Sequence, residues 1–410
     1  MAEKDRLPAG DREAARLLAI QMEKPKAKRG DLALTALFLS VIFAFALLFW
    51  VLPDRTMSER ENRTLTTFPT FTVSRLFSGE YTKELGEYVA DQFPGRDLFI
   101  TVKAATERLL GKNENNGVLF GKDGTLIPRE DFPDTLSLRE NLTSLSAFAA
   151  FCAERDIPLT LAVTGRTADV LVEELPAGYG TAYSENLWAS ITASAAETGL
   201  RFVDLSAPLR QKAADGAYVY YRTDHHWTTL GAYYGYEELA STLGFTPSPL
   251  SDFDRRTVSL TFRGTAWSTA GAAWVEAEPM EFFRYAGDDT FVTSILDRGA
   301  ETSFTGFYDE SYLSGKDKYS AFLSGNHALV TVRGEGEGRE TLLLLKDSFA
   351  HALSPFLARH YDLVIVDLRY YKQSVVPLLE EYSVDGVLAL YNVDSLTVPD
   401  SQTMLLAGLS

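Results

Sequence analysis

The 410-residue sequence has a single cysteine, Cys152, and only five histidines. One thiol excludes an internal disulfide and any zinc cage built from cysteines. Cys152 lies in the apolar run LSAFAAFCAERDIPL, which predicts a buried helix residue rather than a reactive thiol. Positive charge is also scarce, and the formal net charge is −17. This argues against nucleic acid as a partner, because few cationic side chains are available to neutralise phosphates and release their counterions. No internal repeat or low-complexity tract is visible, and the 46% apolar content can fill a sizeable core.

One apolar run is unusually long. No charged residue occurs between Asp31 and Asp54, and residues 32–52 are almost entirely apolar. As a helix this stretch would span roughly 30 Å, the thickness of the hydrocarbon core of a bilayer. We therefore predict a transmembrane helix over residues 31–52, with membrane contact through residues 32–52. A cleaved signal peptide is the alternative, but the run is too long for one and no small-x-small cleavage site follows it.

The residues before this run carry positive charge, at Lys24, Lys26, Lys28 and Arg29. The positive-inside rule then predicts that residues 1–30 form a cytoplasmic N-terminal tail. The chain that follows the helix would lie on the outer side of the membrane. The expected location is the plasma membrane, crossed once, with the folded part of the chain extracytoplasmic.

The remaining chain divides according to its hydrophobic pattern. Residues 53–115 begin with a polar stretch, and their apolar residues then recur at helical spacing. This pattern predicts a juxtamembrane arm. Residues 116–410 predict the main domain. There, short runs of Val, Ile and Leu alternate with helical segments, as is typical of an α/β fold with a parallel sheet covered on both faces. Residues from about 245 to 325 show no long period and are rich in Thr, Ser, Gly, Phe and Trp, so they predict a β-rich or loop-rich insert.

A serine lies where such a sheet would place its chemistry. In the run LLLLKDSFAHAL, Ser348 follows a strand and precedes a helix. Functional groups gather beyond the C-terminal ends of strands in open α/β sheets. There the serine hydroxyl would be exposed, and backbone N–H groups at the start of the helix could stabilise an oxyanion. The alternative is that Ser348 or Asp347 only caps the helix.

A base for this serine is offered by the run RTDHHWTTLGAYYGYEEL. A serine hydroxyl is a weak nucleophile until an imidazole takes its proton, and the imidazole needs a carboxylate to fix its tautomer. Asp224 and His226 are two residues apart, so in an extended loop they share one side, while His225 would point the other way. We expect Trp227 to pack beneath them. Metal binding and hydrogen-bonded packing are the alternatives, although no further His or Cys at ligand spacing supports a metal.

The DHHW run, together with LLLLKDSFA and PFLARHYDLVIVDLRYY, resembles the DHHW family of exported bacterial proteins. It is also similar to the SGNH-hydrolase-like domain of the alginate O-acetyltransferases. This resemblance implies an SGNH-hydrolase-like α/β/α sandwich in which the Asp-x-His pair precedes the serine. It implies that Asp224 orients the imidazole of His226, that His226 is the base and that Ser348 is the nucleophile. The implied chemistry is acyl transfer through an acetyl-serine intermediate, from an acetyl donor to a polysaccharide acceptor. We expect no cofactor and no metal. A polytopic membrane-bound O-acyltransferase is the implied partner.

The sequence departs from the hydrolase pattern beside the nucleophile. Such hydrolases have Gly-Asp-Ser where this chain has Lys346, Asp347 and Ser348, and no Gly-x-Asn-Asp block supplies a side-chain donor. Arg369 and Asn392 each follow a predicted strand and, with Asp347, are the expected oxyanion or substrate-binding residues. Each side chain could equally serve only to make hydrogen bonds within its own loop. His351 is an alternative base, but it would face the next helical turn, so His226 is preferred.

Two other functions fit the same residues. A carbohydrate esterase would use the same triad with water as the acceptor, and water exclusion cannot be deduced from sequence. A catalytically inactive surface scaffold or glycan-binding protein could instead use the aromatic residues of the insert. The acidic composition favours a neutral or amino-sugar acceptor over a polyanion, which a negative groove would repel.

Overall fold

The computed structural model describes residues 29–58, 63–129, 135–297 and 299–409. The lysines at 24, 26 and 28, and nearly all of the expected cytoplasmic tail, lie outside the described residues. The described residues form two compact units. One comprises residues 29–56 and 65–96, and the other comprises 57–58, 63–64 and the described residues from 97 onward. The predicted boundaries at 53 and 115 remain predictions.

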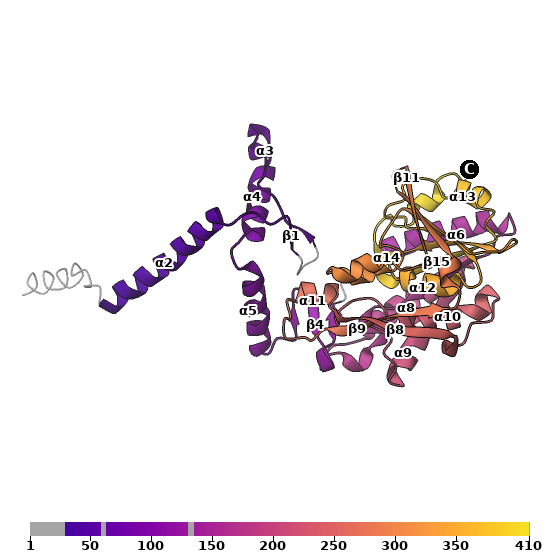
Figure 1. Ribbon diagram of the computed structural model, residues 1–410, viewed down its shortest axis with the longest axis horizontal. Coiled ribbons are helices and arrows are strands. Elements are labelled where there is room, and N and C mark those ends of the chain that lie inside the picture. Colours follow the sequence, from indigo (N-terminus) through magenta and orange to yellow (C-terminus); the bar gives the residue numbers. More distant parts are fainter. Residues whose placement is uncertain (1–28, 59–62, 130–134, 298, 410) are drawn as a thin grey trace, which may run out of the picture. The chain divides into compact units, whose positions relative to one another are not determined.

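The first unit is helical (Figure 1). Its α2 helix, Arg29–Val51, has no buried residue, and by length and composition it could cross a membrane, as a single-pass anchor requires. Two helices follow, α3 (Val73–Ser78) and α4 (Glu80–Asp91). Thr72 caps α3, and Gly79, at φ 83°, ends it because glycine tolerates the left-handed region.

The second unit begins with small elements. These are the β1–β2 hairpin (Met57–Ser58 and Arg63–Thr64), helix α5 (Arg96–Leu109), and a three-stranded sheet of β3 (Glu114–Asn115), β4 (Val118–Phe120) and β5 (Leu126–Pro128). An Asn-Gly turn joins β3 and β4, with Asn116 and Gly117 at φ values of 49° and 74°.

An eight-stranded sheet forms the centre of this unit, in the order β11-β10-β12-β14-β13-β15-β6-β7. Its strands are β6 (Leu159–Thr164), β7 (Arg201–Asp204), β10 (Val292–Asp297), β11 (Ala300–Thr305), β12 (Leu329–Arg333), β13 (Thr341–Lys346), β14 (Asp362–Val366) and β15 (Gly386–Asn392). The strands from β14 to β7 run parallel. The expected parallel α/β core is therefore present.

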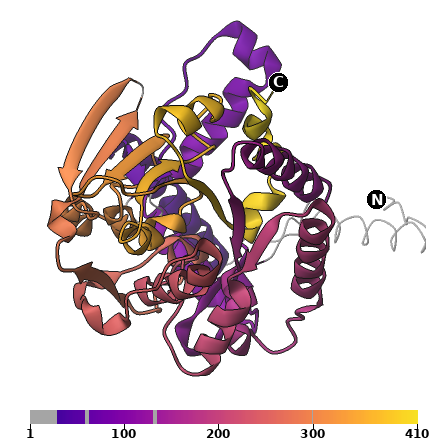
Figure 2. The ribbon, with the colours of Figure 1, turned by 90° about the vertical axis from the view of Figure 1, so that its right-hand side faces the viewer.

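The prediction for the other part of the sheet needs correction. Strand β12 was expected in a parallel sheet, but it pairs antiparallel with both β14 and β10. The insert is β-rich, as expected, yet it does not stand apart: its β10–β11 hairpin forms one edge of the central sheet, the long orange arrows of Figure 2. The remaining strands of the insert, β8 (Phe253–Phe262) and β9 (Glu278–Tyr285), form a separate antiparallel pair.

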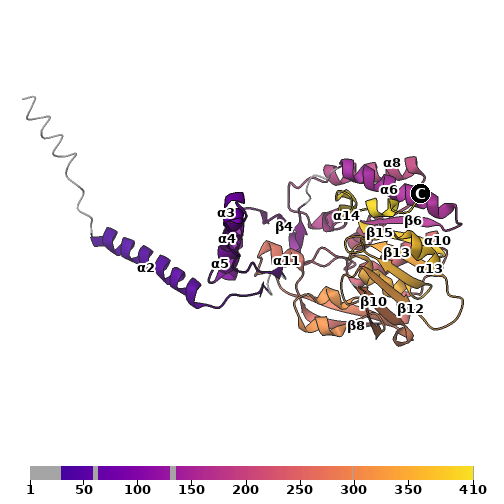
Figure 3. The same ribbon diagram turned by 90° about the horizontal axis from the view of Figure 1, so that it is seen from above.

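Helices cover both faces of the sheet because its strands are apolar on both. In β13, Leu342 and Leu344 join one hydrophobic cluster, while Leu343 and Leu345 join another, as the two-residue period of a strand requires. The first face is covered by α9 (Ser206–Ala214), α10 (Thr229–Leu243), α12 (Ala350–Leu357) and the β8–β9 pair. The opposite face is covered by α6 (Thr135–Ala153), α8 (Ala182–Thr198), α13 (Val376–Glu381) and α14 (Val393–Thr397). Figure 3 shows α6 and α8 along one side of β6 and β15. The result is an α/β/α sandwich.

Short helices complete the unit. They are α7 (Thr167–Val170), α11 (Thr265–Ala270) and 3-10 turns at Lys122–Gly124, Val172–Glu174, Leu250–Asp252, Asp288–Thr290, Glu310–Ser314, Lys318–Ala321 and Thr403–Leu406. Cys152 is fully buried in α6, as predicted. Its burial raises the pKa of the thiol to about 12, so almost no thiolate is present at neutral pH.

Candidate active site

Ser348 lies in the turn between β13 and α12, with the helix beginning two residues later at Ala350. Asp347 shapes this turn from within. Its buried carboxylate accepts hydrogen bonds from the backbone N–H of Phe349 at 3.0 Å, the backbone N–H of Asn392 at 2.7 Å and the hydroxyl of Ser395 at 2.6 Å. Asp347 therefore ties the turn that carries Ser348 to the end of β15.

The DHHW residues lie in the loop between α9 and α10. Thr228 caps α10 by accepting a hydrogen bond from the backbone N–H of Gly231 at 3.1 Å. Trp227 is fully buried, and its indole N–H donates to the carbonyl of Phe349 at 2.9 Å. The indole also packs against the Phe349 ring with centroids 5.6 Å apart. Trp227 thus fastens this loop directly to the turn that carries Ser348.

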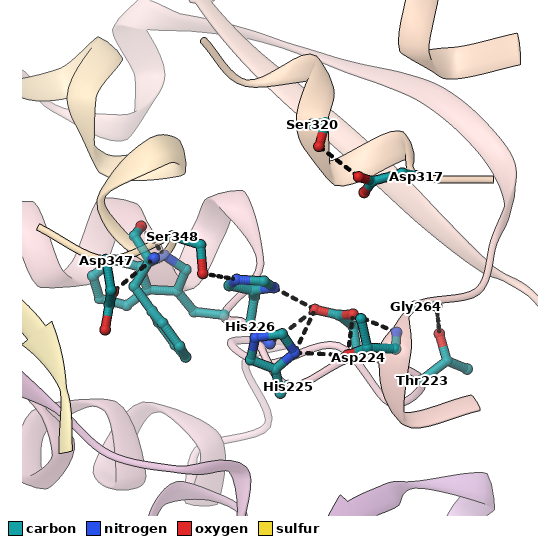
Figure 4. Close-up of polar contacts among 12 residues, drawn as sticks. Thr223, Asp224, His225, His226, Gly264, Asp317, Ser320, Asp347 and Ser348 are labelled. Atoms are coloured by element: carbon teal, nitrogen blue, oxygen red, sulfur yellow. Dashed lines mark hydrogen bonds and ion pairs between the residues drawn. The ribbon is translucent and has the colours of Figure 1, made fainter. Parts of the chain in front are cut away.

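Three of the predicted residues lie in a line of hydrogen bonds (Figure 4). The Nε2 atom of His226 is 2.7 Å from the Oγ of Ser348, and its Nδ1 atom is 2.5 Å from an Oδ1 oxygen of Asp224. A carboxylate can only accept, so the imidazole proton belongs on Nδ1. That tautomer leaves the Nε2 lone pair facing the serine hydroxyl, which is the arrangement a general base needs.

Asp224 is held by the insert as well as by its own loop. Its Oδ2 atom accepts hydrogen bonds from the backbone N–H of Thr265 at 2.7 Å and from the Thr265 hydroxyl at 3.1 Å. A side chain at Gly264 would collide with the Asp224 carboxylate, so glycine is required for this close approach. Burial raises the pKa of Asp224, but the two adjacent histidines and these hydrogen bonds outweigh burial and hold it well below its ordinary value. The carboxylate is therefore ionised at neutral pH.

His225 was expected to point away, and this prediction is wrong. Its ring lies against that of His226 with centroids 3.8 Å apart, and its Nδ1 atom is 2.7 Å from the Thr265 hydroxyl. The α11 segment reaches the loop and offers this partner, which local alternation cannot reveal. Burial and the neighbouring His226 lower the pKa of His225 to about 4, so it is neutral at pH 7.

These same residues form the one grouping of potential metal ligands among the described residues. One ligand atom each from Asp224, His225 and His226 lies within 4.8 Å of the others. Both Asp224 oxygens and the Nδ1 atoms of both histidines already make hydrogen bonds. A cation could bind there only by displacing bonds that orient His226 toward Ser348.

A pocket of about 240 Å³ surrounds the serine and both histidines. Tyr319 forms one wall, stacked on the His226 ring with centroids 3.9 Å apart and planes 11° apart. Arg369 also lines this pocket. Its guanidinium is held by both oxygens of Asp367 at 2.9 and 2.6 Å and by Asn326 at 3.1 Å.

The other two residues expected at the oxyanion or substrate, Asn392 and Asp347, lie outside the pocket lining. Asn392 donates from its amide to the carbonyl of Gly165 at 2.8 Å and caps α14 through the backbone N–H of Asp394 at 3.0 Å. Asp347 makes the turn contacts described above. The structure therefore brings Arg369 to the pocket with Asp224, His226 and Ser348, and it gives Asn392 and Asp347 positions that support the surrounding loops.

Lys346 occupies the position of the hydrolase glycine and is buried behind the serine. Its Nζ atom is 3.1 Å from Asp367 and 2.7 Å from the Nε2 of His351. Burial and the adjacent lysine hold the pKa of His351 well below its ordinary value, so its neutral Nε2 accepts from the ammonium group. His351 is thus engaged with Lys346, while His226 is the imidazole that contacts Ser348.

Sequence reasoning missed Gly264, Thr265 and Tyr319. All three come from the insert, between 40 and 95 residues away from the DHHW loop, and their residue types carry no catalytic signal. Nothing in the local sequence indicates that they lie beside Asp224 and His226.

Comparisons with known proteins find relatives in two families. Residues 118–281 match the family described as the SGNH hydrolase-like domain of acetyltransferase AlgX, and residues 209–367 match the family described as DHHW protein. A probable alginate O-acetylase AlgJ from Pseudomonas aeruginosa is 30% identical over 172 residues, which cover 41% of this chain and 43% of the relative. The match thus spans less than half the length of that curated relative.

Two solved structures share the fold. A DHHW family protein from Eubacterium siraeum has a TM-score of 0.60 at 21% identity and covers 72% of this chain and 97% of its own. Bacillus cereus PatB1, solved with a sulfonyl adduct, has a TM-score of 0.58 at 19% identity and covers 70% of this chain and 99% of its own. Residues 118–367 of this chain thus match the DHHW and SGNH-hydrolase-like families that the sequence motifs suggested.

Proposed function

We propose that this protein is an extracytoplasmic O-acetyltransferase that modifies a cell-surface polysaccharide through Ser348, His226 and Asp224. The observation that supports the proposal most strongly is the continuous contact from carboxylate to imidazole to hydroxyl, at 2.5 and 2.7 Å, across 122 residues of sequence. The similarity to AlgJ proteins, which are named as probable alginate O-acetylases, supports the choice of reaction.

In the first half-reaction, the Ser348 oxygen attacks the carbonyl carbon of an acetyl ester while His226 takes the hydroxyl proton. The new C–O bond forms, the donor alcohol leaves, and His226 returns the proton to that alcohol. In the second half-reaction, His226 removes a proton from a sugar hydroxyl, whose oxygen attacks the acetyl-serine. Ser348 leaves and regains the proton, so atoms and charge balance.

Two groups with unused hydrogen-bond donors are the proposed stabilisers of the oxyanion in both half-reactions. The backbone N–H of Ser348 donates to no other group among the described residues. The Nη1 group of Arg369 likewise has no hydrogen-bond partner in the described part of the chain, while the rest of its guanidinium is fixed by Asp367 and Asn326. A preorganised donor of this kind contributes on the order of 10²- to 10³-fold in kcat.

We propose that α2 anchors the enzyme with its N-terminus in the cytoplasm and the sandwich outside. The apolar character of α2 supports anchoring, and the basic residues of the preceding segment support the orientation. A polytopic membrane-bound O-acyltransferase that exports acetyl groups is the proposed partner.

The test begins with hydrolysis of a chromogenic acetyl ester by the full-length protein in detergent. Ser348→Ala and His226→Ala should each lower kcat/KM by at least ~10³-fold relative to wild type. Addition of an oligosaccharide acceptor should then yield acetylated sugar. Release of acetate without acetylated sugar would indicate an esterase, and equal background rates in all three proteins would indicate a scaffold.

A further inference from the structure

A second histidine borders the pocket that contains Ser348. His351 lies three residues after the serine, and its backbone N–H donates to the Ser348 carbonyl at 3.3 Å. Its side chain lines the pocket and is 2% exposed. The ring lies beside that of Tyr319, with centroids 6.4 Å apart and planes 22° apart. His226 and His351 therefore border one pocket from two different elements, the DHHW loop and α12.

Lys346 determines which nitrogen of His351 carries a proton. Its Nζ atom is 2.7 Å from the Nε2 atom of His351, and an ammonium group can only donate. The Nε2 lone pair must accept this hydrogen bond, so the proton of the neutral ring is on Nδ1. The lysine is itself buried and held by Asp367 at 3.1 Å, which restricts the position of the ammonium group.

The Nδ1–H group of His351 is an unused donor. It has no hydrogen-bond partner among the described residues, and it is shielded from bulk solvent. A buried donor without an acceptor destabilises the folded state, so such groups are rare in native proteins and need an explanation. An acceptor atom on a molecule bound in the pocket provides one, because the imidazole lines the pocket.

The two histidines have opposite chemistry at the nitrogen that each leaves available, although both carry their proton on Nδ1. His226 donates this proton to Asp224, and its Nε2 lone pair faces Ser348. In His351 the Nε2 lone pair is occupied by the bond from Lys346, so this ring cannot take the serine proton and can only donate. A neutral donor suits an oxygen that is uncharged in the ester and becomes negative as the serine attacks.

We propose that His351 is a further catalytic residue, whose Nδ1–H donates to the carbonyl oxygen of the bound acyl group and to the oxyanion that forms when Ser348 attacks. The hydrogen bond strengthens but the proton stays on Nδ1, so the proton balance of both half-reactions is unchanged. Lys346 is a positioning residue that keeps this proton on Nδ1. The inference rests on the proposed acyl-transfer function, and it gives a role to the lysine that replaces the hydrolase glycine.

Hydrolysis of the chromogenic acetyl ester by the full-length protein in detergent tests both residues. His351→Phe keeps a ring but removes the donor, and it should lower kcat by at least ~10²-fold with little change in KM. His351→Asn presents an amide N–H near the position of Nδ1 and should recover at least ~10-fold of that loss. Lys346→Met leaves the tautomer unfixed and should lower kcat by about 10-fold. The matched control is His360→Gln, which should retain the wild-type kcat, because His360 bonds to Tyr236 at 2.7 Å and lies outside the pocket lining.

Inhibition by methylboronic acid separates a catalytic role from a structural one. This compound adds to a serine hydroxyl and forms a tetrahedral boronate, which resembles the intermediate of acetyl transfer. Its inhibition constant reports only molecules with an intact site, so partial unfolding would lower the apparent kcat without changing this constant. In His351→Phe the constant should rise at least ~10-fold, and in His351→Asn it should return toward the wild-type value. In Lys346→Met, which tests the same donor if His351→Phe does not fold, the constant should rise about 3-fold or more.

The outcomes distinguish this inference from the proposed function. If His351→Phe keeps kcat and the inhibition constant within about 3-fold of wild type while Ser348→Ala is inactive, the donor role of His351 is wrong and the triad stands. A lower kcat with an unchanged inhibition constant would show a merely structural role and would also overturn the inference, as would an equal loss of kcat in His360→Gln. If wild type hydrolyses the ester no faster than Ser348→Ala, the proposed function fails and the inference fails with it.

Discussion

His226 has two neighbours that act on different atoms of its ring. Asp224 accepts from Nδ1, and Tyr319 covers one face, so the ring is fixed in both tautomer and plane. The uncommitted Nε2 lone pair then faces Ser348. Because burial keeps Tyr319 uncharged, with its pKa well above the ordinary value, the wall contributes shape and a low local dielectric constant rather than charge.

Replacement of the carboxylate tests this tautomer argument. Asp224→Asn preserves size but presents an amide that can donate to Nδ1, which would move the imidazole proton to Nε2. We expect kcat for acetyl ester hydrolysis to fall by about 10²- to 10⁴-fold with little change in KM. A variant that retains wild-type kcat would show that Asp224 does not orient the base.

A second residue-scale prediction concerns Gly264. A methyl group there would overlap the Asp224 carboxylate, so Gly264→Ala should displace the carboxylate from His226 and reduce kcat by roughly 10-fold or more. Gly180→Ala is the matched control, because a Cβ at Gly180 meets nothing within 4 Å. Equal activity of the two variants would contradict the close approach of α11 to the DHHW loop.

At the scale of elements, one buried acid on β9 fastens the DHHW loop to the insert. Glu278 accepts hydrogen bonds from the backbone N–H groups of Arg222 and Thr223, both at 2.8 Å, and also from the hydroxyls of Thr223 and Tyr218. The loop that carries Asp224 and His226 is therefore supported by a strand more than 50 residues later.

Removal of this acid should cost stability. Glu278→Ala leaves several buried donors without an acceptor, so we expect the free energy of unfolding to fall by about 3 kcal/mol, measured by urea denaturation. Glu281→Ala removes a partly exposed partner of Arg255 and should cost less than about 1 kcal/mol. Similar losses in both variants would argue against a special role for β9 in holding the loop.

The sequence predicted the elements whose signal is local. The apolar run of α2 and the parallel strands β6, β7, β13, β14 and β15 follow from the hydrophobic period within short windows. The direction of β12, the joining of β10–β11 to the sheet, and the position of His225 depend on contacts between distant segments. Asp224, His226 and Ser348 were identifiable because their residue types are chemically specific, whereas Tyr319 and Thr265 were not.

At the scale of the whole molecule, the proposed orientation can be tested with cysteine labelling. The native Cys152 is buried and its pKa is raised to about 12, so it should not react with a maleimide. Ser251→Cys places a new thiol at an exposed position. We expect a membrane-impermeant maleimide to label this variant on intact cells and to leave wild type unlabelled. Labelling that requires permeabilised cells would contradict an extracytoplasmic domain.

The central claim is that His226 activates Ser348, and covalent trapping tests it most directly. A sulfonyl fluoride transfers its sulfonyl group to an activated serine. Because this group is not passed on to an acceptor, the adduct accumulates. Mass spectrometry of the treated wild-type protein should find one adduct, located on Ser348. In His226→Ala the same adduct should form at a rate at least ~10²-fold lower. No adduct, an adduct on another residue, or equal rates in the two proteins would contradict the account.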